Sequence, residues 1–208
     1  MRKFFIVICL ILISIGCSIF QKDLTVQQKV EKLQKQLDKW QSFTIDGIIE
    51  INHKQYDFRR NIHLKRRNNH FRLDIYDSGI MGLSPSPYLT IICDSSLTVR
   101  TENSSLKEQI NESFEDYSEV LRHFKTKLIL ENHKDIIDNL KFETSIASVS
   151  FYPNFRLKII KKDKISVEFK YHTNYELQKI IIYSEKKEIA NIIIDKVHHG
   201  KISEIKNE

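Results

Sequence analysis

Few residues in this sequence could do chemistry, and their spacing fits no known class of catalytic site. The chain has 208 residues, among them three cysteines and eight histidines. It contains neither G-x-S-x-G, which presents a nucleophilic serine, nor H-E-x-x-H, which places two zinc ligands on one helix face. His198 and His199 are adjacent in a predicted strand, so their rings point to opposite faces and cannot easily share a metal ion. We therefore expect no enzymatic activity, no metal and no cofactor.

Nucleotide and nucleic-acid sites are also unexpected. The five glycines are too scattered for a phosphate-binding loop or for G-x-G-x-x-G. The formal net charge of +6 permits an anionic partner without identifying one. The acidic residues between 112 and 119 fit the solvated face of a helix rather than a site.

Cys17 is the residue with the most specific chemical assignment. The apolar run of residues 4–15 follows Arg2 and Lys3 and would form a helix of roughly 18 Å, short of the ~30 Å needed to span a bilayer. A basic start, a short apolar centre and a small residue at its end are typical of a secretory signal peptide. The final Ser14-Ile15-Gly16-Cys17 resembles a bacterial lipobox. The alternative is a buried N-terminal helix followed by a chance Gly-Cys pair.

The lipobox implies that residues 1–16 are a signal peptide, that Cys17 carries covalent lipid, and that residues 17–24 form a tether. Two or three acyl chains hold a protein firmly, at about 0.8 kcal/mol per buried CH₂. Ser18 follows the cysteine, and by resemblance to proteobacterial lipoproteins this favours the outer membrane. We expect a lipid-anchored protein of the cell envelope that faces the periplasm, where a nucleic-acid partner is excluded. Cys93, in an apolar run, is predicted to be a buried thiol.

Residues 77–87 form an unusual predicted loop. Turn-forming Gly, Ser and Pro residues surround three large apolar side chains, those of Ile80, Met81 and Leu83. One interpretation is an exposed apolar tip that inserts into lipid. The other is a loop that folds back so that its apolar residues cap the end of the domain.

Arg59, Arg60, Lys65, Arg66 and Arg67 form a basic cluster on a predicted hairpin. Arg59, Arg60, Arg66 and Arg67 are candidate contacts for lipid phosphates, because a basic residue near an anionic surface contributes about 1 kcal/mol. Such a cluster is also typical of a solvated strand that discourages edge-to-edge pairing.

Hydrophobic periodicity predicts one mainly β domain over residues 25–208. Thr25 to Gln28 form a capping box, and an apolar residue then recurs every three or four positions as far as Trp40, which predicts a helix. The period changes to two from Phe43, and short polar breaks separate the runs, which predicts an antiparallel sheet with one apolar face. The expected strands are 43–52, 56–65, 71–75, 88–94 and 96–102, then, after helices at 105–124 and 134–140, 142–151, 155–161, 165–171, 177–183 and 189–197.

This order resembles the Lol-type (LolA/LolB) family of lipoprotein carriers and receptors, and its receptor branch most closely because of the lipobox. The resemblance extends from about residue 37 to residue 197. It is clearest in Trp40 with residues 43–47, in a basic second strand, and in residues 71–76 leading into Gly79-Ile80-Met81-Gly82. It implies a single antiparallel, unclosed half-barrel of about ten to eleven strands, with helices lidding an apolar cavity that takes acyl chains. In the receptors the corresponding loop projects an apolar residue toward the membrane, and Met81 best matches that position.

The resemblance implies a monomeric, membrane-anchored chaperone that receives lipoproteins from a periplasmic lipoprotein carrier and helps insert them into the outer membrane. Its expected partners are lipoprotein acyl chains, the carrier and the membrane surface. Two alternatives remain at this point. One is a lipid-binding envelope protein without a receptor role, and the other is a structural lipoprotein whose interior is filled by its own side chains.

Overall fold

The computed structural model describes residues 24–53, 56–76, 86–94, 96–104, 107–108, 126–145 and 147–200. The predicted signal peptide, Cys17, the loop residues Ile80, Met81 and Leu83, and most of the helix predicted over 105–124 lie outside the described residues. Those predictions remain predictions. None of the described helices is long and apolar enough to cross a bilayer.

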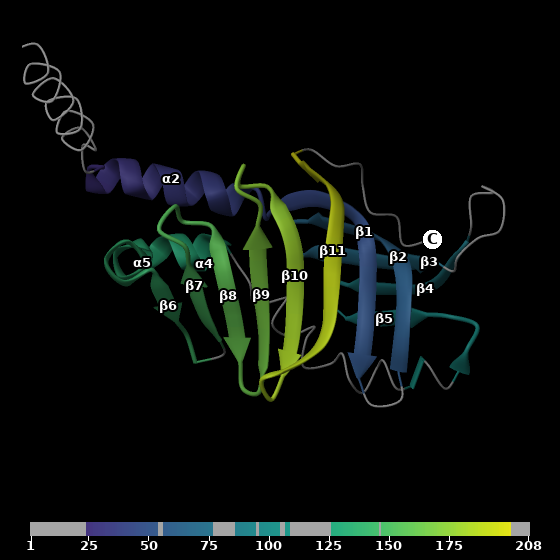
Figure 1. Cartoon of the computed structure of the whole chain (residues 1–208). Helices are drawn as coiled ribbons and strands as arrows, with labels where there is room; N and C mark the ends of the chain where they lie inside the picture. Colours follow the sequence, from purple (N-terminus) through teal and green to yellow (C-terminus); the bar gives the residue numbers. More distant parts are fainter. Residues whose placement is uncertain are drawn as a thin grey trace, which may run out of the picture.

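Eleven strands form one antiparallel sheet in the order β5-β4-β3-β2-β1-β11-β10-β9-β8-β7-β6 (Figure 1). Each half is a meander, and pairing of β1 with β11 joins the halves. β5 and β6 are the two free edges, so the sheet is not closed, and the predicted fold class is confirmed. The strands are β1 (Ser42–His53), β2 (Tyr56–Arg67), β3 (His70–Tyr76), β4 (Pro87–Cys93), β5 (Leu97–Arg100), β6 (Lys141–Glu143), β7 (Ser148–Phe151), β8 (Leu157–Lys162), β9 (Ile165–Tyr171), β10 (Leu177–Ser184) and β11 (Lys187–His199).

The helix α2 (Val26–Asp38) begins at the predicted capping box. The Thr25 hydroxyl accepts a hydrogen bond from the backbone N–H of Gln28, and the Gln28 side chain accepts one from the backbone N–H of Thr25. Two donors of the first turn are thereby satisfied. The apolar side of α2 buries Leu33 and Leu37 completely.

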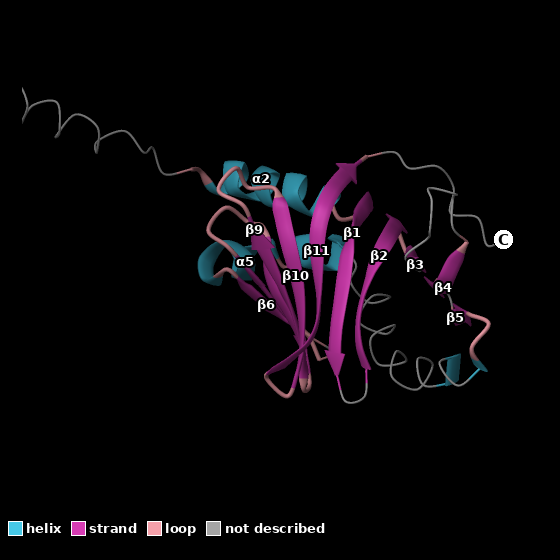
Figure 2. Cartoon of the chain, turned by 45° about the vertical axis from the view of Figure 1, so that its right-hand side comes forward, coloured by secondary structure: helices cyan, strands magenta, loops and turns pink. Residues whose placement is uncertain are grey.

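Two short helices follow the first half of the sheet, α4 (Thr126–Glu131) and α5 (His133–Asn139). α5 confirms the helix predicted at 134–140. α2 contacts both α4 and α5, and α5 contacts β6. Figures 1 and 2 show these helices against the β6–β10 half, with the sheet bending around them.

One expected strand, residues 142–151, is two strands in the structure. Thr144 closes a tight turn between β6 and β7, because its backbone N–H donates to the Ala147 carbonyl at 2.9 Å and its hydroxyl accepts from the Ala147 N–H at 2.9 Å. A side chain that bonds its own turn in this way competes with the strand ladder.

The face that carries the buried cluster is called the inner face below, and the opposite one the outer face. The cluster extends from Leu33 in α2 to Ile192 in β11. Every described residue of the cluster thus belongs to the segment from residue 24 onward, and we expect this segment to fold without the residues that precede it.

Candidate functional site

The candidate site is the inner face of β1–β5. Alternate residues of these strands point inward, and nearly all are aliphatic or aromatic. They are called the apolar wall here, and each is only 1–5% exposed: Phe43, Ile45, Ile49, Ile62, Leu64, Leu73, Ile75, Leu89, Ile91 and Val99.

Register explains why the wall is continuous. Ile45 lies opposite Leu64, Leu64 opposite Leu73, and Leu73 opposite Ile91. In this row every strand contributes an apolar residue, so apolar side chains pack across the strands as well as along them. Ile51 and Phe58 lie opposite each other near the β1–β2 hairpin. They are only partly buried and form the hairpin end of the wall.

The inner face of the other half has a different cover. Side chains from α2, α4 and α5 pack there, and Leu33, Leu37, Ile129 and Ile136 are at most 2% exposed. In Figures 1 and 2 the helices α2, α4 and α5 do not belong to the β1–β5 half, and Figure 2 shows a short helical piece beside β5.

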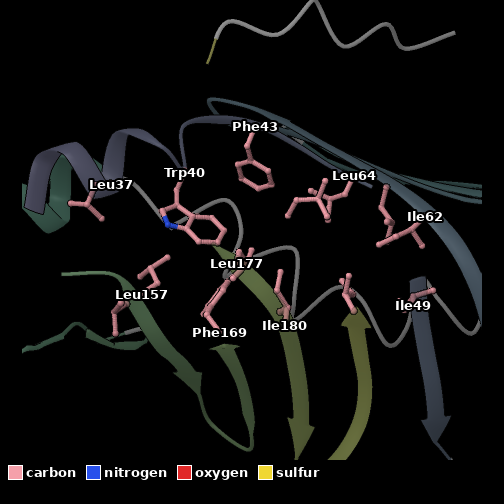
Figure 3. Close-up of a cluster of buried hydrophobic side chains, with 14 of the residues drawn as sticks. Leu37, Trp40, Phe43, Ile49, Ile62, Leu64, Leu157, Phe169, Leu177 and Ile180 are labelled. Carbon is pink, nitrogen blue, oxygen red and sulfur yellow. The ribbon is translucent and has the colours of Figure 1, made fainter. Parts of the chain in front are cut away.

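Trp40 joins the two halves of the inner face. Its ring makes edge-to-face contacts with Phe43 of β1, at 5.4 Å between centroids, and with Phe169 of β9, at 5.1 Å. Figure 3 shows Trp40 between Leu157, Phe169 and Leu177 of one half and Phe43 and Leu64 of the other. Aromatic pairs in this geometry contribute about 0.5–1.5 kcal/mol beyond the area they bury.

The four candidate arginines of β2 lie on two faces, because successive residues of a strand point to opposite sides. Arg60 and Arg66 have the same parity as the wall residues Ile62 and Leu64 and point inward, whereas Arg59 and Arg67 point outward. Arg59 is exposed, and its Nε lies 3.4 Å from a Glu50 carboxylate oxygen. The structure thus brings the four together on one strand but not on one surface.

Arg66 is the more deeply buried of the two arginines that point inward from β2. It is 8% exposed and lies in register with Phe43 and Phe71. Its Nε donates a hydrogen bond to the Asn68 carbonyl at 3.0 Å. Burial lowers the pKa of its guanidinium to about 10, which still leaves it charged at neutral pH.

The outer face carries a row of polar residues that was not predicted from the sequence to form a cluster. The Asp46 carboxylate lies 2.5 Å from Nδ1 of His63 on the adjacent strand. One strand further, Asp74 is 5% exposed and accepts hydrogen bonds from Nε of Arg72 (2.9 and 3.0 Å) and from the Thr90 hydroxyl (2.7 Å). These residues are outward positions of the four adjacent strands β1 to β4. The alternation of apolar and polar residues along each strand is the signal that could have identified them.

The remaining chemical candidates are structural in the described part of the chain. Cys93 is 2% exposed, as predicted for a buried thiol. No group of three or more His, Cys, Asp or Glu side chains among the described residues could hold a metal ion. The lipidation site Cys17 and the loop residues Ile80, Met81 and Leu83 fall outside these residues.

His199 connects the end of β11 to the end of α2. Its Nδ1 lies 2.9 Å from the Lys39 carbonyl, to which it donates a hydrogen bond. Burial lowers the pKa of His199 below its ordinary 6.5, and the nearby charges of Lys39 and His198 lower it further, against the opposing effect of the hydrogen bond.

The pH dependence of stability follows from this shift. The unfolded chain takes up the His199 proton first as pH falls, so this contribution to stability is complete above about pH 6.5 and decreases below it. His199→Asn keeps a donor near the Lys39 carbonyl but does not titrate. We expect the wild type to lose more of its unfolding free energy than the variant on acidification through pH 6.5, measured by urea denaturation. Equal losses would show that His199 does not contribute.

Comparison with known proteins yields no family model and no curated protein that matches this sequence. Solved structures do match. A LolA superfamily protein from Nitrosomonas europaea has 10% sequence identity and a TM-score of 0.42, over 86% of this chain and 96% of that one. MucB, solved in complex with MucA(peri), has 12% identity and a TM-score of 0.34, over 85% of this chain. This chain spans about half, 56%, of the length of MucB. At such identities and scores these likenesses carry no functional argument, and the function proposed below rests on the sheet of this chain.

Proposed function

We propose that this protein binds acyl chains on the apolar wall of its half-barrel. One observation carries the proposal: aliphatic and aromatic side chains, interrupted by Arg60 and Arg66 of β2, extend over the inner faces of five adjacent strands. A flexible chain of methylene groups is complementary to such a surface, because neither side requires a polar partner. The proposed activity makes and breaks no covalent bond, so it needs no nucleophile, metal or cofactor.

The free energies are consistent with a carrier. Moving a sixteen-carbon chain out of water is worth on the order of 12 kcal/mol. The wall residues are already buried, so the protein gains only the difference between its contacts with the ligand and the contacts that the ligand displaces. We therefore expect an affinity far below the transfer free energy, which suits a protein that must also release its ligand.

The test is a titration of a fluorescent fatty acid into the fragment 18–208, which lacks Cys17 and contains all described residues of the buried cluster. We expect saturable binding with a stoichiometry near one, and competition by unlabelled palmitate. The same titration into the unfolded fragment serves as the control for nonspecific uptake of a hydrophobic dye. Absence of saturable binding would refute the proposal and favour the structural alternative, in which the protein's own side chains fill the inner face.

The wider role that we propose is that of a lipid-anchored receptor that accepts lipoproteins and helps insert them into the outer membrane. Its support comes from the sequence: the lipobox at Cys17 and the apolar loop with Ile80, Met81 and Leu83. This role requires release of a bound acyl chain to vesicles, whereas the alternative of a simple lipid-binding envelope protein requires only binding. Transfer from a donor protein to vesicles therefore distinguishes the two.

A further inference from the structure

A group of basic residues with an exposed tyrosine lies at the end of the sheet near α2, and the functions above do not use it. We call Lys35, Lys39, Arg156 and Tyr175 the rim patch. Lys35 is in the last turn of α2 and Lys39 is its C-cap. Arg156 belongs to the turn between β7 and β8, and Tyr175 to the turn between β9 and β10. Figures 1 and 2 show α2 at the sheet end where both turns lie.

The two turns have the same construction. In each, the first backbone N–H donates to the carbonyl four residues later at 2.9 Å, from Tyr152 to Arg156 and from His172 to Glu176. An asparagine side chain accepts from the backbone N–H two residues later in both turns. The residue after that asparagine has positive φ: 62° at Phe155 and 70° at Tyr175.

Equivalent positions in these turns have different environments. Phe155 is 4% exposed and packs in the core, whereas Tyr175 is 60% exposed. The Arg156 guanidinium lies 4.4 Å from the centroid of the Tyr175 ring and 5.6 Å from that of Tyr171. Stacking of this kind holds a cation in place while its edge stays available to an anion.

The cations of the rim patch are mutually close, and within the described part of the chain none of them forms an ion pair. Arg156 and Lys35 both lie near enough to Lys39 to lower the pKa of its ammonium, in addition to the larger effect of its burial. Elsewhere on the sheet, basic residues such as Arg59, Lys164 and Lys170 lie within 4.0 Å of a carboxylate. Among the described residues, no carboxylate lies that close to Lys35, Lys39 or Arg156. The patch is thus a cluster of positive charges, and no described carboxylate lies close enough to neutralise them.

We propose that the rim patch docks on the anionic surface of a phospholipid bilayer, with lipid phosphates among Lys35, Lys39 and Arg156 and the Tyr175 ring at headgroup level. Charge complementarity and the exposed aromatic ring determine this choice. A tyrosine presents an apolar body with a polar tip, which suits the boundary between headgroups and acyl chains. The inference rests on the proposed function for its membrane setting only, and its test does not depend on acyl-chain binding.

The experiment is co-sedimentation of fragment 18–208 with phosphatidylcholine vesicles, with and without phosphatidylglycerol. We expect binding only with the anionic lipid and weakening in high salt. In Lys39→Gln/Arg156→Gln, loss of two basic residues lowers the partition coefficient roughly thirtyfold, at about 1 kcal/mol each and 1.4 kcal/mol per tenfold change. Lys35→Gln/Lys39→Gln leaves the Arg156 stack intact and is expected to show a similar loss.

The matched control is Arg59→Gln/Arg67→Gln, which changes the net charge equally on the outer face of β2. An equal loss in this control would overturn the proposal, because net charge or the β2 arginines would then explain the attraction. Binding that does not depend on phosphatidylglycerol would also overturn it. Fatty-acid binding is measured on the same variants. If the fragment binds vesicles through the patch but binds no fatty acid, the docking inference stands and the proposed function fails.

Discussion

Replacing Trp40 with alanine is expected to lower the free energy of unfolding by about 3–5 kcal/mol, the range for removal of a large buried aromatic side chain. Trp40 is 9% exposed and contacts Phe43 and Phe169, which lie on strands of different halves. The variant loses the contact area of the indole and both edge-to-face pairs, and leaves a cavity where the halves meet. Urea denaturation followed by far-ultraviolet circular dichroism measures the change.

Two comparisons make this prediction specific. Trp40→Phe keeps an aromatic ring at the junction and is expected to lose less than half as much stability. Tyr88→Ala removes an aromatic ring that is 43% exposed on β4, and we expect a change of well under 2 kcal/mol. If Trp40→Ala cost no more than Tyr88→Ala, Trp40 would not hold the two halves together.

Gly47→Ala is the second change with a large expected effect. The pairing of β1 with β11 shifts register between Asp46 and Gly47, and this brings the backbone of β11 against Gly47. A Cβ atom here would lie 2.2 Å from the Ile193 carbonyl oxygen and 3.3 Å from the Ile194 Cα. Both atoms belong to the backbone, so relief requires movement of β11 itself. We expect a loss of about 1–3 kcal/mol or more, the usual cost of forced overpacking.

The readout that separates this effect from general destabilisation is amide hydrogen exchange. Among the described strands, β1 and β11 are the one hydrogen-bonded pair that connects the two halves of the sheet, so exchange should increase most in these two strands. Thr44→Ala, on the same strand, adds no atom and is expected to change stability little. Uniform exchange throughout the sheet, or unchanged stability in Gly47→Ala, would contradict the close approach.

Local patterns predicted much of this fold. The capping box at Thr25 and the apolar spacing after it located α2, because both depend only on residues within one or two turns. Strict alternation located β1 to β3 to within a few residues, since one face of each is buried and the other is polar. The order of these elements resembles that of the Lol-type family, and the half-barrel class was predicted from that resemblance.

Features that depend on residues distant in the sequence were harder to predict. Residues 142–151 were predicted as one strand although the large apolar residues change from even positions (Phe142, Ile146) to odd ones (Val149, Phe151). The hydrogen bonds of Thr144 show that a turn separates two strands there. The β1–β11 pairing joins segments more than a hundred residues apart, and no local pattern specifies it.

The candidate sites illustrate the same limit. The β2 arginines form a cluster in sequence, yet alternation divides them between a buried face with Arg66 and an outer face with Arg59. The rim patch was invisible in sequence because its residues come from α2 and from two turns that only the folded sheet brings together. Its one local sign was the repeated turn pattern around Asn154 and Asn174.

We propose that acyl chains bind on the inner face of the sheet. The single tryptophan of the sequence reports directly on that face. Trp40 lies between the two halves of the buried cluster. The measurement is quenching of Trp40 fluorescence in fragment 18–208 by palmitic acid brominated along its chain, since bromine quenches tryptophan at close range. We predict saturable quenching that unbrominated palmitic acid reverses. Saturable binding of the fatty acid without any quenching of Trp40 would place the ligand elsewhere and contradict the account.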